Sequence, residues 1–137
     1  MEQKNRAQLY TKLLKAKRNI NPVKKDGLNP HFKSGYPTLN SMIEAVETAL
    51  MDEGLLLTQP IQDGEQATFI TDVETGESVS SFMKLPELDN PQKVKSCSTY
   101  YRRTTLSGLL GLRETDDDGN DAIPKRKPTL EPERFTN

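Results

Sequence analysis

The fold of this chain is decided by residues 90–121, which read NPQKVKSCSTYYRRTTLSGLLGLRETDDDGND. Asn90 is a residue type that caps helices, and Pro91 suits a first helical turn because its ring fixes φ where no N–H partner is needed. No Gly or Pro interrupts the chain again before Gly108, and Gly111 can end a helix in the left-handed conformation. The stretch therefore predicts a long helix that follows Asn90 and ends at Gly111.

This predicted helix has two different faces at about 100° per residue. One face carries mostly small or apolar residues, namely Val94, Cys97, Ser98, Tyr101, Thr105, Gly108, Leu109 and Leu112. Because several of them are small, we expect this face to lie close against a sheet. The opposing sector carries Lys95, Thr99, Arg102 and Arg103 without an acidic residue. Such a helix suits the border of a groove that binds a polyanion.

Two blocks of the sequence resemble one protein family. The first comprises SCSTYYRR at 96–103, LSGLLGL at 106–112 and DDDG at 116–119, and the second is NPHFKSGY at 29–36. In this order they resemble the ERF (essential recombination function) family of phage-type single-strand annealing proteins, over roughly residues 5 to 121. Lys95 stands where the family usually has Gly, and Thr104 stands where it has a second Tyr. The first departure adds a cation, and the second removes an aromatic ring from position 104.

The resemblance implies a fold shared with annealing proteins that assemble into rings or helical filaments. It also implies a function, ATP-independent binding and annealing of single-stranded DNA in phage-type homologous recombination. The implied partners are single-stranded DNA, further copies of the chain, and a phage exonuclease or a host single-strand binding protein.

The rest of the chain predicts an α+β single domain. Helices are expected over 2–18 and 38–53, and a short hairpin is expected around an Asp26-Gly27 turn. Three strands over 55–62, 65–73 and 78–85 form an antiparallel meander, which Pro60 interrupts and Asp63-Gly64 turns. In the second strand, Ala67, Phe69 and Thr71 alternate as the apolar face. The predicted domain covers 1–121, and 122–137 is a polar segment that is either a flexible tail or an assembly arm.

Composition limits the function classes. The chain has 137 residues and one cysteine, which excludes an intramolecular disulfide framework. The N-terminus lacks the apolar core of a secretory signal, and no apolar run approaches the length of a membrane span. We therefore expect no membrane association and a cytoplasmic location, in the bacterial host if the chain is phage-encoded.

The net charge of −1 conceals strongly segregated blocks. Residues 1–34 hold nine Lys/Arg and two Asp/Glu, whereas 35–90 hold one and eleven. Residues 91–113 hold five Lys/Arg and no acid, and 114–121 hold five acids and no Lys/Arg. Two basic segments favour nucleic-acid binding, although charge blocks are also common as solvated faces. A further hypothesis is that the first two blocks complement each other between neighbouring protomers.

The predicted DNA-binding residues lie in these two basic segments. Arg102 and Arg103 beside Tyr100 come first, because a guanidinium is planar and always charged and aromatic rings stack on bases. One of the two arginines has the alternative of a structural ion pair with the acidic helix. The other candidates are Lys95, Thr99, Lys33, Tyr36, Lys24 and Lys25. Tyr36 and Phe32 either stack on bases or fix a loop to the core, and His31 is expected at the surface.

Catalytic motifs are weak. No Gly-rich phosphate loop is present, and one His and one Cys far apart provide no nucleophile pair, so we expect a non-catalytic protein without a cofactor. Asp116, Asp117 and Asp118, with Glu114 and Asp121, either bind Mg²⁺ loosely without catalysis or act in electrostatics or assembly. A metal nuclease is disfavoured, since adjacent aspartates project in different directions. The rival from another class is an ERF-like interaction or regulatory protein that binds a protein partner.

Overall fold

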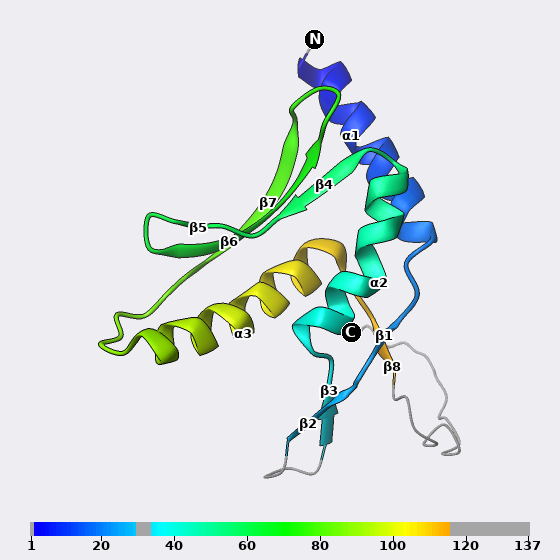
Figure 1. Ribbon diagram of the computed structural model, residues 1–137. Coiled ribbons are helices and arrows are strands. Elements are labelled where there is room, and N and C mark those ends of the chain that lie inside the picture. The colour runs from blue at the N-terminus through cyan, green and yellow to red at the C-terminus, as the bar shows by residue number, and fades with distance from the viewer. Residues whose placement is uncertain (1, 30–33, 116–137) are drawn as a thin grey trace, which may run out of the picture.

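The computed structural model describes residues 2–29 and 34–115 (Figure 1). The helices are α1 (Glu2–Arg18), α2 (Leu39–Asp52) and α3 (Pro91–Leu110). The strands are β1 (Val23–Lys24), β2 (Gly27–Asn29), β3 (Ser34–Tyr36), β4 (Leu55–Thr58), β5 (Ile61–Gln62), β6 (Glu65–Asp72), β7 (Ser78–Lys84) and β8 (Glu114–Thr115). The predicted α+β class is confirmed. The predicted boundary at residue 121 and the segment 122–137 lie outside the described residues.

The main sheet is the predicted antiparallel meander, with β6 at its centre. Strands β4 and β5 pair with one edge of β6, and β7 pairs with the other. Pro60 lies between β4 and β5 and interrupts the strand, because proline has no N–H for the hydrogen bonds of a β-ladder. Asp63 and Gly64 turn the chain with φ of 50° and 76°, the positive values of a two-residue hairpin turn.

Local capping sets the helix ends as the sequence predicts. The Asn90 side chain accepts a hydrogen bond from the backbone N–H of Gln92 at 2.8 Å, and Gly111 ends α3 in the left-handed region at φ 61°. Thr38 caps α2 by accepting from the N–H of Ser41 at 3.2 Å. Helix α1 spans the predicted residues 2–18. These interactions join residues a few positions apart, which is why the sequence alone predicts them.

The N-terminal hairpin differs from its prediction. Gly27 begins strand β2 instead of forming a turn with Asp26, and β2 pairs with β3 in the register Gly27↔Tyr36. The Asp26 carboxylate accepts from the backbone N–H and the hydroxyl of Thr38, at 3.0 and 3.1 Å. Strand β1 pairs in parallel with β8, Val23 opposite Glu114. Thr38 and Glu114 lie outside the local window of the Asp-Gly pattern, so that pattern alone misplaced the turn.

All three helices contribute to one hydrophobic core. Leu9 and Ala16 of α1, Val46 and Leu50 of α2, and Leu106 of α3 are fully buried there. Figure 1 shows α3 running below the sheet, and α3 contacts β6, β7 and α2. In the described parts of the chain, no helix is long and apolar enough to cross a membrane.

The predicted inner face of α3 is only partly correct. Ser98 and Thr105 are buried as expected, but so are Leu106 and Leu110, whereas Gly108 is exposed and Tyr101 and Cys97 are half-buried. The helix packs on two neighbours at once. Its Ser98 and Thr105 contact the sheet, and its Leu106 and Leu110 enter the core shared with α1 and α2. The prediction expected α3 to pack on the sheet alone, and it therefore left Leu106 and Leu110 off the buried face.

The buried face of β6 is polar, contrary to the prediction that Phe69 and Thr71 point inward. Gln66, Thr68, Ile70 and Asp72 are fully buried, together with Ala67. Gln66 accepts a hydrogen bond from the Ser98 hydroxyl at 2.5 Å, and Thr68 lies 2.6 Å from the hydroxyl of Thr105. Each buried polar side chain thus has a partner on a helix, which removes the usual penalty of desolvation.

Candidate nucleic-acid interface

The guanidinium of Arg103 lies against two tyrosine rings. Its central carbon is 4.8 Å from the ring centre of Tyr36 and 5.4 Å from that of Tyr100. Tyr100 and Arg103 come from α3, whereas Tyr36 comes from β3 of the N-terminal hairpin. Tyr100 is 55% exposed and Tyr36 is half-buried. The sequence predicted all three as DNA-binding residues, and the fold brings them together.

The position of Tyr36 depends on Gly27. These residues are opposite each other in the β2–β3 register, and a Cβ atom added to Gly27 would lie 2.5 Å from Cζ of Tyr36. No side chain fits there without moving the ring. The hairpin is also tied to α2 by Asp26, and the hydrogen bond from the Thr38 backbone N–H is the main reason that the pKa of Asp26 is lowered. The ring that meets Arg103 is therefore placed by strand pairing and by a helix cap.

A pocket of about 430 Å³ opens beside this cluster. Tyr36, Tyr100 and Arg103 form part of its wall, with Thr104, Ser107 and Gly108 from the same face of α3. The buried residues Pro37 and Met42 also line it, as does the acidic residue Glu114 of β8. Sequence reasoning did not assign Thr104, Ser107, Met42 or Glu114 to this site. The spacing of positions 100, 103, 104, 107 and 108 along one helical face was the available signal.

Arg102 does not share a sector with Arg103. It lies on the side of α3 that carries Ser98 and Thr105, and its backbone carbonyl accepts from Gln59 at 3.0 Å. Its Nε is buried and has no hydrogen-bond partner among the described residues. The prediction of one continuous cationic sector is therefore wrong for Arg102, because consecutive residues of a helix point about 100° apart.

Neither arginine is neutralised by a carboxylate within residues 2–29 and 34–115. The ion pairs seen in this part of the chain involve Arg6 and Lys12, both from α1. The alternative that Arg102 or Arg103 forms a structural ion pair with the acidic helix has no support in the described structure.

The other predicted DNA-binding residues that the structure describes lie outside this cluster. Lys95 is exposed on α3, and the Thr99 hydroxyl donates to the Lys95 carbonyl at 3.1 Å. Lys24 belongs to β1 opposite Thr115, and the Lys25 backbone N–H donates to the Thr115 carbonyl at 3.1 Å. None of these residues lines the pocket. Lys33, Phe32 and His31 lie outside the described residues.

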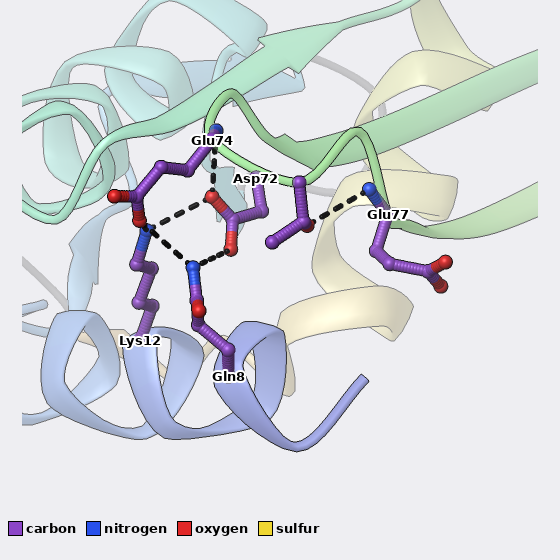
Figure 2. A network of polar contacts seen from close by, with 6 residues as sticks. Gln8, Lys12, Asp72, Glu74 and Glu77 are labelled. Carbon is purple, nitrogen blue, oxygen red and sulfur yellow. Dashed lines mark hydrogen bonds and ion pairs between the residues drawn. The ribbon is translucent and has the colours of Figure 1, made fainter. Parts of the chain in front are cut away.

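A second polar cluster joins α1 to the turn between β6 and β7 (Figure 2). Lys12 Nζ lies 2.9 Å from Asp72 and 2.8 Å from Glu74, and Gln8 donates to both carboxylates. Arg6 pairs with Glu77 at 3.0 Å and also donates to the Ser78 carbonyl at 2.9 Å. Two cations of the basic first block are thus neutralised by the acidic middle block inside one protomer. Part of the charge complementarity that was hypothesised between protomers therefore occurs as ion pairs within one protomer.

Asp72 is the buried centre of this cluster. Burial acts to raise the pKa of its carboxyl, but hydrogen bonds from Lys12, the Glu74 backbone N–H and Gln8 outweigh burial, and the pKa is lowered. Hydrogen bonds to the carboxylates of Glu74 and, to a lesser extent, Asp72 raise the pKa of Lys12. The cluster is therefore a satisfied structural network.

The described residues contain no group of three or more His, Cys, Asp or Glu side chains placed to hold a metal ion. The predicted loose Mg²⁺ site at Asp116, Asp117 and Asp118 lies outside the described residues, and it stays a prediction. Cys97, half-buried on α3, is a free thiol.

Fold and site together define a small α+β protein with an open cationic and aromatic surface between a helix and a hairpin. The family model of the ERF superfamily matches residues 9–132, so the chain belongs to the ERF superfamily. This membership confirms the resemblance carried by the sequence blocks and indicates a phage-type recombination or annealing protein. No curated protein and no solved structure matches the chain.

Proposed function

We propose that this protein binds single-stranded DNA and anneals complementary strands without ATP, acting as an oligomer on the DNA. The observation that carries the proposal is the state of Arg103. Its guanidinium is held by two tyrosine rings, has no carboxylate partner among the described residues and borders an open pocket. Family membership supports the same conclusion, since annealing proteins of this family are generally non-catalytic.

The chemistry of annealing suits such a surface. Annealing breaks and forms no covalent bond, and it requires a strand that is held extended with its base edges accessible. Arg103 supplies a fixed positive charge for phosphate, and the exposed ring of Tyr100 supplies a stacking face for a base. Lys95 adds charge on an earlier turn of α3, and Arg102 adds charge on the adjoining side of the helix.

Oligomerisation follows from the small number of contacts per protomer. A few phosphate contacts give weak binding at physiological salt. Protomers assembled along one strand would combine their contacts through effective concentration. We propose a homo-oligomer, either a ring or a helical filament, that works in the bacterial cytoplasm with a phage exonuclease or a host single-strand binding protein.

The experiment that tests this function mixes two complementary labelled oligonucleotides with the full chain and no nucleotide, and follows pairing by fluorescence. We expect faster pairing with protein than without it. If no protein concentration accelerates pairing and no single strand is bound, the proposal is wrong. A stable complex with a protein partner under those conditions would then favour the interaction-protein alternative.

Two tyrosines provide a matched comparison in the same assay. Tyr100 and Tyr10 are 55% and 53% exposed, and each lies beside an arginine. Tyr100→Ala should slow annealing and weaken single-strand binding about fivefold or more, because base stacking contributes roughly 1–3 kcal/mol per base. Tyr10→Ala should leave both unchanged. Equal effects of the two substitutions would contradict the assignment of the surface.

A further inference from the structure

The pocket beside Arg103 extends beyond the cluster of Arg103, Tyr36 and Tyr100. It holds about 430 Å³ and is open to solvent, within the size range of small-molecule sites. Gly108 faces it from α3, and a Cβ added there would meet no atom within 4 Å. A side chain added at position 108 would therefore enter open space at the pocket.

The lining selects the type of ligand. Pro37 and Met42 are buried and apolar, and Tyr36 and Tyr100 present ring surfaces. A phosphate group gains nothing from apolar walls and is repelled by the carboxylate of Glu114. A flat heterocycle with polar edges matches both the apolar surfaces and the polar groups. We propose that this pocket takes one unstacked nucleobase of the bound strand while Arg103, at its margin, takes the adjoining phosphate.

Glu114 adds a preference among the bases. A carboxylate only accepts hydrogen bonds, so it pairs with the exocyclic amino group of cytosine, adenine or guanine. Thymine has no exocyclic amino group and offers a carboxylate only its N3–H, which lies between two carbonyl oxygens that a carboxylate repels. The pocket should therefore favour amino-bearing bases over thymine. This inference rests on the proposed function, because it names the part of single-stranded DNA that this site receives.

The consequence for annealing is that one base per bound site is withheld from pairing until a complementary strand competes for it. The remaining bases keep their edges free. Such a site would hold a strand against sliding without reading a long sequence.

The test measures binding of the full chain to four fluorescent 20-mers at one salt concentration by anisotropy. The four are oligo-dC, oligo-dA, oligo-dT and an abasic strand. Wild type should bind oligo-dC and oligo-dA several-fold more tightly than oligo-dT, and the abasic strand least. Equal binding of oligo-dC and oligo-dT would overturn the assigned preference.

Gly108→Leu tests whether a base enters the pocket. Leucine is a good helix former, and its side chain would project into the recess. We expect about tenfold weaker binding of oligo-dC, with unchanged binding of the abasic strand. Ser96→Leu is the matched control, since Ser96 is exposed on α3 and does not line the pocket. Full oligo-dC affinity in Gly108→Leu would overturn the inference while leaving the proposed function intact.

Glu114→Gln tests the source of the preference. Glutamine both donates and accepts, so the ratio of oligo-dC to oligo-dT affinity should fall towards one. An unchanged ratio would show that Glu114 does not cause the base preference. A wild-type chain that binds none of the four strands would refute the proposed function itself, which is a different outcome from a failed base preference.

Discussion

In the described residues, Arg6 and Arg103 each lie near the ring of a tyrosine on their own helix, at nearly the same distance. Arg6 lies 5.5 Å from the ring centre of Tyr10, and Arg103 lies 5.4 Å from that of Tyr100. Their surroundings differ. Arg6 is also bound to Glu77 and the Ser78 carbonyl, whereas Arg103 contacts a second ring, that of Tyr36, and forms no ion pair within the described residues. A cation beside an aromatic ring is therefore no evidence of a binding site until its carboxylate partners are known.

The same contrast separates the two regions as wholes. At the corner of α1, β6 and β7, Lys12 and Gln8 satisfy the buried carboxylate of Asp72 (Figure 2). Between α3 and the β2–β3 hairpin, charge and aromatic surface stay open to solvent. The first region should govern stability and the second ligand binding, and the following predictions test that division from the largest expected effect to the smallest.

The largest effect is expected at Asp72, which is fully buried. Asp72→Asn removes the charge that Lys12 pairs with, and the free energy of unfolding should fall by about 2 kcal/mol in urea titrations. Lys12 retains some exposure, which limits the loss. Glu74→Gln is the control. Glu74 is 71% exposed, so its loss should cost well under ~1 kcal/mol. Equal costs would contradict the central role of Asp72.

Gly27→Ala should damage the binding region through a residue that touches no ligand. The added Cβ would lie 2.5 Å from Tyr36, so the ring must move away and its contact with Arg103 weakens. Overpacking of this kind costs roughly 1–3 kcal/mol of stability. Single-strand affinity should fall severalfold as well, measured at a temperature where the variant stays folded. Native affinity in a folded Gly27→Ala chain would show that the Tyr36–Arg103 contact is dispensable.

The same substitution in each pair, Arg103→Gln and Arg6→Gln, compares the two arginines directly. Arg103→Gln should weaken single-strand binding about tenfold and reduce the salt dependence by ~0.7 per lost phosphate contact, with little change in Tm. Arg6→Gln should lower Tm and leave DNA affinity unchanged, because its partners lie within the fold. The division fails if Arg6→Gln weakens DNA binding as much as Arg103→Gln.

The smallest effect is a pH dependence. The pKa of Asp72 is lower in the folded chain than in the unfolded one, so the folded state favours the deprotonated form. The contribution of Asp72 to the free energy of unfolding is fully present above its unfolded pKa, about 3.9. It is lost as the pH falls through the folded pKa. Urea midpoints should therefore decrease on acidification below about pH 4, and the decrease should be shallower in Asp72→Asn. Parallel curves for both proteins would assign the acid sensitivity elsewhere.

Much of the fold follows from residues that are close in sequence. The caps at Asn90, Thr38 and Gly111 and the turn at Asp63-Gly64 each depend on a few neighbouring positions, and the structure has each one as predicted. The order of helices and strands followed from them. The face of β6 was mispredicted because apolar character was the criterion, and the buried side chains of Gln66, Thr68 and Asp72 are polar. Their hydrogen-bond partners, which include side chains on α1 and α3, make that burial favourable.

The candidate site divides in the same way. Residue type alone selected Arg103, Tyr100 and Tyr36, because phosphate and bases call for guanidinium and aromatic groups in any fold. The sequence by itself determined which chemistry the chain carries and where its helices begin and end, since both depend on single residues and near neighbours. Only the tertiary structure decided which cations are neutralised. It joined Arg6 and Lys12 to acids more than 50 residues away, since long-range packing sets those distances. It also brought Glu114 and Arg103 to the lining of one pocket and placed that arginine near two tyrosine rings.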